Sequence, residues 1–517
     1  MRQRHIASPT RDCGPPSVAG VLARMRTLAI SGVEAVPVDA EIDIHRGLPA
    51  FTIVGLPDAA VRESRERVRA ALVNSGFDFP LQRITANLAP ADLRKAGPGY
   101  DLAIAAAILV ASDQLAGAPL DGWWLAGELA LDGGIRPLPG ALAMAERVER
   151  EGGRGFALPA ANAPEAGLIE GPAIAPLGSL ADLRTLAAGE IPAGPAPIAS
   201  RSAPALPDLA DLKGQPGLRR GLEIAAAGGH AALVVGPPGA GKSLAARRLP
   251  SILPPLSRRE AIEVTRIASV AGRPSADGTL APRPFRAPHH TISAAGLVGG
   301  SSPPRPGEIT LAHRGVLFLD ELGEFSRASL EALRQPLEDG EVTISRARGA
   351  TTLPADFQLF AAANPCPCGY GVDSPRCSCT AERVRAYAAR LSGALADRID
   401  LVLAVEQPSA AALSGDPGET SAEVAARVLD AREAQRERLG PDRVNASMTD
   451  AEIAESAGLD QDARAALVSG HDEYGLSGRG WNRVIKVART CADLDGSRAV
   501  GADHVAEALA LRRREAG

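Results

Sequence analysis

A glycine-rich run near the middle of the chain has the residue types that bind nucleotide phosphates. It follows the apolar stretch AALVV and precedes a helical pattern, which predicts a strand, a loop and the start of a helix. A chance glycine-rich turn is the alternative, and it does not account for the flanking strand and helix. The run is a P-loop pattern and predicts ATP binding by Gly236, Pro237, Pro238, Gly239, Ala240, Gly241, Lys242 and Ser243.

Each part of this loop has a chemical reason. Glycines let backbone N–H groups close around the phosphates, and the following helix directs the positive end of its dipole at them. Lys242 adds positive charge at the β- and γ-phosphates, and the hydroxyl of Ser243 is a ligand for Mg²⁺.

Two carboxylates end a second buried stretch, GVLFLDE. Asp320, at the end of the predicted strand, is positioned to hold Mg²⁺ together with Ser243, and Glu321 is positioned to polarise the attacking water. A surface turn with two acids is the alternative, but its place downstream of a P-loop favours ATP hydrolysis.

Three further residues are predicted to complete the hydrolytic site. Asn364 ends the strand QLFAAAN, where an amide orients the water or senses the γ-phosphate, although Asn also ends strands as an ordinary turn residue. Arg398 in LADRIDL is a candidate finger toward a neighbouring subunit's nucleotide. Arg479 begins a C-terminal helix and is expected to reach the γ-phosphate of its own subunit, with Arg483 on the same helix as the alternative. For Arg398 and for Arg479, an ordinary surface salt bridge is the alternative interpretation.

The elements that must position these residues indicate a multidomain α/β protein of 517 residues. VPVDAEIDI and ITANLAP read as strands, whereas DAAVRESRERVRAALVNSG and YDLAIAAAILVAS read as helices. We expect a disordered or non-native leader (1–20), an α/β domain (21–188), a linker rich in Pro and Ala (189–207), an ATPase core with a parallel sheet (208–405) and a helical lid domain (406–517).

Charge and hydropathy limit the partners and the cellular location that we expect for the protein. The formal net charge is −5, so any contact with nucleic acid must come from local basic patches. The start of the chain has no apolar core typical of a secretory signal, and the longest apolar run, Leu102 to Ala111, is about half of a membrane span. We therefore expect a cytoplasmic protein with no membrane partner.

Several long runs resemble a known family. RPFRAPHHTISAAGLVGG, PGEITLAHRGVLFLDELGEF, NPCPCGY and LADRIDL are similar to the magnesium-chelatase-like AAA+ proteins of the YifB/ComM group, and the resemblance extends from about Val21 over nearly the whole chain. Members of this group are bacterial cytoplasmic ATPases, and the ComM branch acts as a hexameric DNA helicase that promotes branch migration during natural transformation. The resemblance therefore implies a homo-oligomer, expected to be a hexamer, and single-stranded or branched DNA as partner.

The resemblance also implies that residues 21–188 are similar to the proteolytic domain of Lon proteases. The Lon serine matches Gly99 in Gly97-Pro98-Gly99, and the Lon lysine matches Leu142. Neither catalytic group is present, so a lysine cannot activate a serine here. We expect this domain to support assembly or DNA threading rather than peptide cleavage.

Two segments are candidate DNA contacts. LEDGEVTISRARGATTLPADFQL reads as two strands around a basic turn that carries Arg346 and Arg348, and it resembles the pore hairpin of chelatase-like motors. A solvated surface hairpin is the alternative. The run FRAPHH offers Arg286, His289 and His290 as a second pore loop; the histidine pair fits a structural or nucleic-acid contact better than a metal site.

Four cysteines form two C-x-C pairs on one loop, Cys366 with Cys368 and Cys377 with Cys379. Four thiolates bind Zn²⁺ tetrahedrally, although spacing by two residues is commoner in zinc sites than this spacing by one. A set of reduced thiols without a metal is the alternative.

The leading hypothesis is thus an ATPase that translocates on DNA, with ATP, Mg²⁺ and the candidate Zn²⁺ as its cofactors. The rivals are a motor for metal insertion of the magnesium chelatase type, a motor that remodels another protein, a protease and a non-enzymatic scaffold. A Lon-like N-terminal domain argues against metal insertion, since chelatase motors begin with the ATPase domain. Gly99 and Leu142 argue against proteolysis, and the intact hydrolytic set argues against a scaffold.

Overall fold

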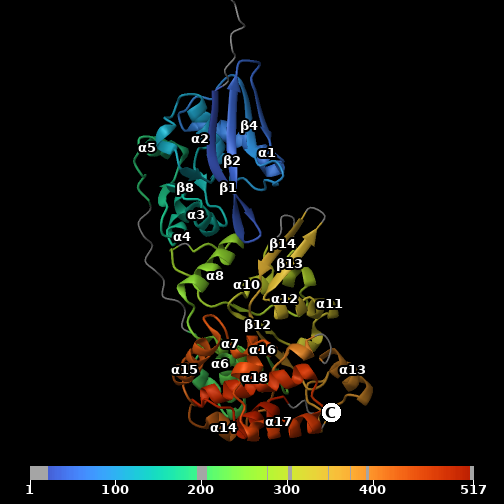
Figure 1. Cartoon of the computed structure of the whole chain (residues 1–517). Coiled ribbons are helices and arrows are strands. Elements are labelled where there is room, and N and C mark those ends of the chain that lie inside the picture. Colours follow the sequence, from blue (N-terminus) through green and yellow to red (C-terminus); the bar gives the residue numbers. More distant parts are fainter. Residues whose placement is uncertain are drawn as a thin grey trace, which may run out of the picture. The chain divides into compact units, whose positions relative to one another are not determined.

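The structure is a computed structural model, and it describes residues 21–194, 206–275, 277–300, 305–346, 349–372, 374–391 and 395–512. The predicted leader and the residues 195–205 of the predicted linker lie outside the described residues. The chain divides into two compact units (Figure 1). We call the described residues 21–30 and 34–194 the N-terminal unit. Residues 31–33 and the described residues from 206 onward form the second unit, which we call the P-loop unit.

The N-terminal unit is built on a seven-stranded mixed sheet. The predicted strands VPVDAEIDI and ITANLAP form an antiparallel pair whose buried and less buried side chains alternate, as half-buried strands require. In spatial order the strands are β3 (Ala50–Val54), β4 (Arg83–Ala89), β2 (Glu34–His45), β1 (Val21–Ser31), β5 (Trp123–Leu125), β8 (Gly155–Pro159) and β9 (Ala173–Leu177).

Two sequence patterns explain the longest helices of the N-terminal unit: an amphipathic pattern in α1 and a continuous apolar run in α2. Asp58 caps the amphipathic α1 by accepting a hydrogen bond of 2.9 Å from the N–H of Val61. The apolar α2 is buried along nearly its whole length, and its one acid, Asp101, pairs with Arg67 at 2.7 Å. The elements are α1 (Ala59–Asn74), α2 (Asp101–Ala111), α3 (Ala141–Arg150), α4 (Ala163–Ala166), α5 (Leu183–Ala187) and a small ribbon of β6 (Glu128–Leu129) and β7 (Ile135–Arg136).

The P-loop unit contains a five-stranded sheet in which all four neighbouring pairs are parallel. The strands are short and apolar because both faces are covered: Val234, Phe318 and Phe360 face one hydrophobic cluster, and Leu233 and Leu317 face another. In spatial order they are β11 (Phe285–Arg286), β12 (Val316–Leu319), β15 (Gln358–Ala363), β10 (Ala232–Val235) and β16 (Leu401–Ala404).

Helices surround this sheet, and those of the C-terminal region pack into the same core. Leu222, Val428 and Ala488 share one hydrophobic cluster with the sheet residue Val234. The helices are α6 (Pro216–Gly228), α7 (Lys242–Ile252), α8 (Arg258–Val270), α9 (Ala294–Val298), α10 (Glu308–Leu311), α11 (Arg327–Glu331), α12 (Arg334–Asp339), α13 (Ala381–Leu391), α14 (Ala410–Ser414), α15 (Ser421–Leu439), α16 (Asp450–Ser456), α17 (Gln461–Tyr474), α18 (Gly478–Leu494) and α19 (Ala502–Ala510).

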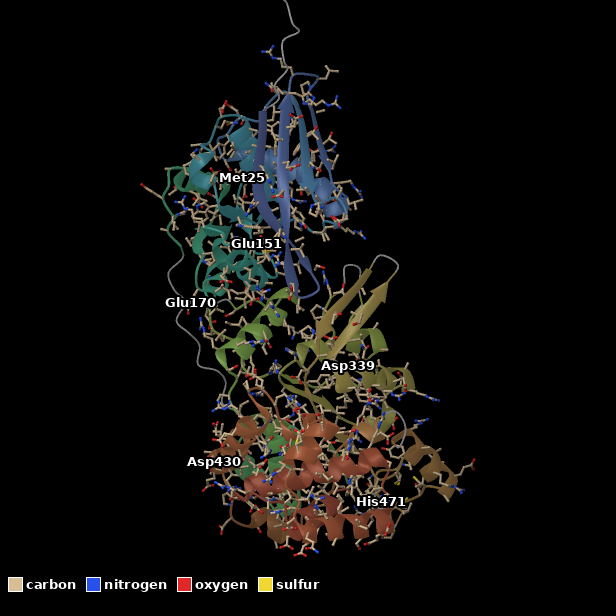
Figure 2. The ribbon with its side chains drawn as sticks, in the orientation of Figure 1. Met25, Glu151, Glu170, Asp339, Asp430 and His471 are labelled. Carbon is tan, nitrogen blue, oxygen red and sulfur yellow. The ribbon has the colours of Figure 1, made fainter. Side chains whose placement is uncertain are left out.

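Charged side chains such as Glu151 and Asp430 are exposed on the two units, whereas Met25 is buried (Figure 2). Among the residues that the structure describes, no helix combines the length and apolar character needed to cross a membrane.

Candidate functional site

The predicted P-loop joins β10 to α7 in the order that the sequence pattern requires. Gly239 and Gly241 have φ angles of +81° and +88°, in the left-handed region that other residues rarely adopt. A Cβ on Gly236 would lie 2.4 Å from the carbonyl oxygen of Val405, so this position admits no side chain. The glycines therefore serve both the turn and the close approach of two strands.

Lys242 begins α7 and connects the loop with the neighbouring strand β15. Its ammonium group donates hydrogen bonds to the carbonyl oxygens of Gly236 and Pro237, at 2.6 and 2.9 Å, and to Oδ1 of Asn364, at 3.1 Å. Burial lowers the pKa of Lys242 from its ordinary value, and the nearby carboxylates Asp320 and Glu321 oppose this shift. The predicted phosphate-binding lysine and the predicted sensor amide thus lie in direct contact.

Ser243 and Asp320 meet at the carboxyl ends of β10 and β12. The Ser243 hydroxyl donates a hydrogen bond of 2.7 Å to Oδ2 of Asp320. A hydroxyl and a carboxylate are hard oxygen donors, which are the ligands that Mg²⁺ prefers beside nucleotide phosphates. The two residues therefore fit a magnesium site.

Glu321 has an unusual backbone conformation, with φ +54° and ψ +50°. Left-handed backbone in a residue other than glycine marks a position that the surrounding structure holds in place. One side-chain carboxylate oxygen of Glu321 lies 3.3 Å from Nδ1 of His290. The sequence does not predict this contact, because FRAPHH indicates only a DNA-contact role for His290.

The three arginines differ in their surroundings. Arg398, at the end of a short 3₁₀ turn, pairs with Glu338 of α12, and only 7% of its side chain is exposed. Arg483 lies on α18 and pairs with Asp400 at 3.1 Å. Arg479 is exposed in the first turn of α18, and no hydrogen bond or ion pair among the described residues joins it to the P-loop.

Asp400 is the centre of a buried network that sequence reasoning missed. Besides Arg483, its carboxylate contacts Nδ1 of His230 at 3.2 Å and accepts a hydrogen bond of 3.3 Å from the N–H of Ala231. The other ring nitrogen of His230 lies 2.8 Å from the hydroxyl of Thr490 on α18. This network ties the segment that carries Arg398 to the C-terminal helices. Asp400, the second of the two acids in LADRIDL, was the available signal in the sequence.

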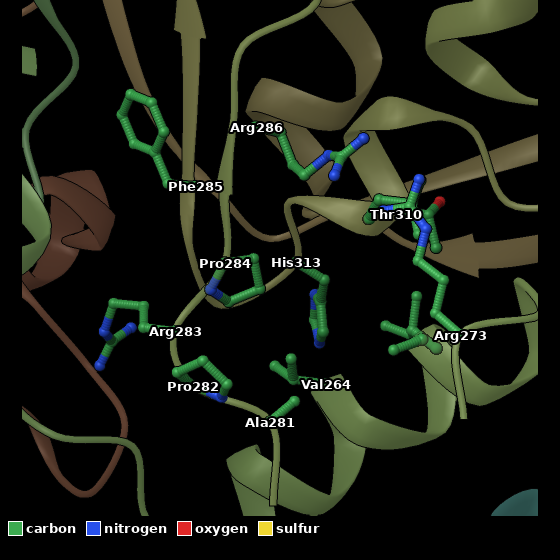
Figure 3. A pocket seen from close by; sticks show the side chains of 13 residues that line it. Val264, Arg273, Ala281, Pro282, Arg283, Pro284, Phe285, Arg286, Thr310 and His313 are labelled. Atoms are coloured by element: carbon green, nitrogen blue, oxygen red, sulfur yellow. The ribbon is translucent and has the colours of Figure 1, made fainter. Parts of the chain in front are cut away.

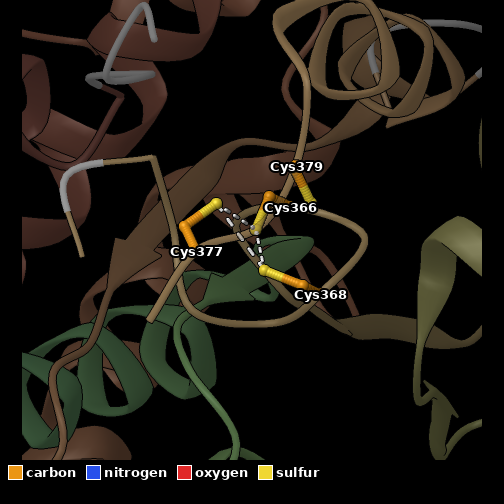
Figure 4. Close-up of side chains that lie close together, drawn as sticks. All are labelled: Cys366, Cys368, Cys377 and Cys379. Atoms are coloured by element: carbon orange, nitrogen blue, oxygen red, sulfur yellow. Dashed lines mark hydrogen bonds between the residues drawn. The ribbon is translucent and has the colours of Figure 1, made fainter. Parts of the chain in front are cut away.

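The four predicted metal-binding cysteines lie together on the loop after Asn364 (Figure 4). Their sulfur atoms all lie within 4.8 Å of one another, and Cys366 is 3.3 Å from Cys368 and 3.8 Å from Cys377. Ligands in a tetrahedral Zn–S₄ site are about 3.8 Å apart, given Zn–S bonds of about 2.3 Å. Hydrogen bonds from the backbone of Tyr370 and Ser378 lower the pKa of Cys368 to about 6, which favours the thiolate there. Burial and hydrogen bonds with the neighbouring thiols raise the pKa of Cys377, to about 11, and of Cys379, so the support for a metal site comes from the sulfur spacing.

The predicted basic hairpin is present as β13 (Glu341–Arg346) and β14 (Gly349–Pro354), paired antiparallel so that Arg346 faces Gly349. Val342 and Leu353 are buried and fix the face that the hairpin turns to the core. The side chain of Arg346 and the whole of Arg348 lie outside the described residues.

The second candidate DNA segment begins at β11. Arg286 pairs with Glu308 through two contacts of 2.7 Å, and it lines a cavity of about 270 Å³ together with Arg283 and His313 (Figure 3). Burial lowers the pKa of both Arg283 and His313. Arg286 is therefore already engaged by an acid, whereas His289 is exposed.

In the N-terminal unit the positions matched to the protease serine and lysine hold no reactive group. Leu142 is fully buried in α3. A Cβ on Gly99 would meet nothing within 4 Å. This region thus has space at one position and an apolar core residue at the other.

Comparison with known proteins matches three regions of the chain to family descriptions. Residues 208–413 match "Magnesium chelatase, subunit ChlI", residues 40–162 match "Subunit ChlI of Mg-chelatase", and residues 418–512 match "Magnesium chelatase, subunit ChlI C-terminal".

Individual relatives cover nearly the full chain. YifB of Escherichia coli (strain K12), described as uncharacterized, is 44% identical over 494 residues, which are 95% of this chain and 97% of the relative. Competence protein ComM of Haemophilus influenzae is 42% identical over 505 residues, with coverage of 95% and 97%. Lon protease 2 of Bacillus subtilis is 28% identical over 155 residues, 26% of this chain and 28% of that protein. The chain belongs to the YifB/ComM family of magnesium-chelatase-like AAA+ proteins.

Proposed function

We propose that the protein is an ATP-hydrolysing, Mg²⁺-dependent motor that assembles into a ring, a hexamer, and translocates on single-stranded or branched DNA. One observation carries the ATPase part. Lys242 contacts Asn364 at 3.1 Å, and Ser243 contacts Asp320 at 2.7 Å, at the carboxyl ends of three neighbouring parallel strands. Ligands of open α/β sheets bind at this edge.

Each residue has one role in this proposal. The loop from Gly236 to Gly241 and the ammonium group of Lys242 bind the phosphates, and Ser243 with Asp320 holds Mg²⁺, which neutralises charge on the phosphates when bound. Glu321 polarises the attacking water, and Asn364 orients it. Arg398 acts on the neighbouring subunit's nucleotide, after leaving Glu338, and Arg479 acts within its own subunit.

The DNA part is supported by the hairpin and by one relative. Arg346 ends β13, Arg348 directly precedes β14 in the sequence, and no acid occurs from Val342 to Ala355. ComM of H. influenzae carries the name competence protein. Six basic hairpins around a channel bind a phosphate backbone without reading bases.

ATP turnover measured with and without single-stranded or branched DNA tests this function. We expect DNA to raise the rate, and the double variant Arg346→Ala/Arg348→Ala to lose the stimulation and flatten the salt dependence of DNA affinity while basal turnover persists. The variant Arg258→Ala/Arg259→Ala, which removes two exposed arginines at the start of α8, is the charge-matched control. If the hairpin variant keeps the parent's affinity and salt slope, the hairpin does not bind DNA.

We further propose that Cys366, Cys368, Cys377 and Cys379 hold one structural Zn²⁺ per chain. The sulfur spacings support this, and the cluster follows Asn364 directly in sequence. Metal analysis of protein purified without added zinc tests it: we expect one equivalent, and no stoichiometric metal together with four titratable thiols overturns it.

A motor for metal insertion, or one that remodels another protein, is the second candidate function. The observation in its favour is that all three matched family descriptions name a magnesium chelatase subunit. ATP turnover stimulated by a protein or porphyrin partner, and unaffected by DNA, favours this candidate over the DNA motor.

A further inference from the structure

The segment between β15 and α13, which we call the cysteine loop, begins at Asn364 and carries four thiols at short spacing. Cys366 is buried, whereas Cys368, Cys377 and Cys379 are partly exposed. The sulfur of Cys368 lies 3.3 Å from that of Cys366 and 3.6 Å from that of Cys377 (Figure 4). A partly exposed thiol with other thiols at this distance is the arrangement in which oxidation of one sulfur ends in a disulfide with the next.

The cysteine loop packs against the phosphate-binding loop. Gly369 has a φ of +96°, and a Cβ there would lie 3.0 Å from Cγ of Pro238, so the backbone of the cysteine loop lies directly on the P-loop. Cys366 fixes the turn that makes this approach. Its carbonyl oxygen accepts a hydrogen bond of 2.9 Å from the N–H of Gly369, and its sulfur accepts one of 3.2 Å from the N–H of Gly371. The position of the Cys366 sulfur therefore determines how the loop meets Pro238.

Both ends of the cysteine loop contact the proposed hydrolytic site. At its start, Oδ1 of Asn364 accepts a hydrogen bond of 3.1 Å from the ammonium group of Lys242. Beyond its end, α13 carries the buried Tyr387, and a Cβ on Gly323 would lie 2.4 Å from the ring of this tyrosine. Gly323 follows Glu321 by two residues. A displacement of the cysteine loop therefore reaches the groups that are proposed to bind phosphate and to orient water.

We infer that the cysteine loop is an oxidation site through which hydrogen peroxide switches off ATP turnover; this inference rests on the proposed ATPase function. The thiolate of Cys368 attacks the peroxide, which forms an S–O bond, breaks the O–O bond and releases hydroxide. The thiol of Cys366 or Cys377 then attacks the resulting sulfenic acid. An S–S bond forms, the S–O bond breaks, and the thiol proton leaves with the hydroxyl group as water. A bound Zn²⁺ thereby loses two thiolate ligands, and the loop that supports Pro238 is rearranged.

Turnover and ATP affinity of the full chain, measured before and after treatment with hydrogen peroxide, test this switch. Mass spectrometry of the peptide that spans residues 366–379 identifies the disulfide, and a chromogenic chelator detects released Zn²⁺. We expect kcat to fall about tenfold or more, since displacement of a catalytic group by about 1 Å costs up to about a hundredfold. ATP affinity should fall less, because Lys242 keeps its charge. Dithiothreitol with Zn²⁺ should restore both; it does not reduce methionine sulfoxide, so recovery assigns the effect to thiols.

Two variants make the result specific. Cys368→Ser removes the sulfur that attacks the peroxide, so its turnover should be the same before and after treatment. Cys13→Ser/Cys491→Ala retains only the four clustered thiols of the six in the chain and should respond as the natural chain does. Turnover that falls equally in Cys368→Ser overturns the switch. So does turnover of the natural chain that persists after the disulfide has formed, an outcome that needs no variant and stands if Cys368→Ser misfolds. No turnover by the untreated natural chain instead means that the proposed function fails.

Discussion

The P-loop unit and the N-terminal unit each resemble a catalytic domain, but the reactive side chains are present only in the P-loop unit. In the P-loop unit, polar side chains that follow three neighbouring strands contact one another: Lys242 with Asn364, and Ser243 with Asp320. In the N-terminal unit, the positions matched to a protease serine and lysine are Gly99 and the fully buried Leu142. Both units keep a packed α/β core, so the fold survives without the chemistry, and activity must be argued from the site.

The two sites differ in how their side chains affect the stability of the fold. Lys242 is half-buried and its pKa is lowered by burial, so its position is a cost to stability that function must offset. Leu142 instead adds apolar burial at the position of a lysine, which stabilises the unit. At the position that we match to the lysine, the N-terminal unit therefore has core packing and no reactive group, whereas the P-loop unit has a charged group.

The largest expected effect is the loss of nucleotide binding in Lys242→Ala. The variant removes the positive charge at the β- and γ-phosphates, and we expect ATP affinity to fall by about a hundredfold or more. Fluorescent nucleotide titration measures it, and Arg247→Ala, which removes an exposed charge from the same helix, is the control. Unchanged affinity in Lys242→Ala contradicts the assignment of the loop.

The next largest effect is a loss of ATP hydrolysis in Arg398→Ala, which tests whether Arg398 acts on the nucleotide of a neighbouring subunit. Arg398→Ala should bind ATP yet hydrolyse it about a thousandfold more slowly, if Arg398 serves the neighbouring nucleotide. Mixed with Glu321→Gln chains, it should recover part of the turnover, where an intact arginine meets an intact carboxylate. Co-assembly without recovery excludes action in trans and leaves Arg398 as the structural partner of Glu338.

The smallest expected effect is none at all. Gly99→Ser restores a hydroxyl at a position where the added Cβ meets nothing within 4 Å, so we expect the variant to fold. It should not cleave unfolded protein, with or without ATP, because Leu142 provides no amine. Cleavage that appears in Gly99→Ser, or any ATP-dependent cleavage by the parent, breaks the comparison between the two units.

Local patterns were sufficient for part of this architecture. The P-loop, the strand before Asp320 and the buried helix α2 were predicted because each depends on adjacent residues: a glycine turn, an apolar run or a continuous apolar segment. The order of strands in either sheet could not be predicted, since pairing depends on contacts between distant segments. The small ribbon of β6 and β7 was not predicted for the same reason.

The candidate site shows the same division. Lys242, Ser243, Asp320 and Asn364 were named from the sequence, and the structure brings them together. The contact of His290 with Glu321 was not named, because nothing local shows that two segments separated by thirty residues meet. Ion pairs between elements, such as Arg398 with Glu338, are likewise decided by tertiary packing.

Steady-state ATP turnover and ATP binding, measured on the same samples of parent and Glu321→Gln protein with Mg²⁺, test the central claim most directly. We predict that the parent hydrolyses ATP and that Glu321→Gln retains its ATP affinity while its turnover falls by about a hundredfold or more, since the variant keeps the phosphate-binding residues but loses the group that polarises water. Turnover by Glu321→Gln at the parent's rate, or no Mg²⁺-dependent turnover by the parent, contradicts the account.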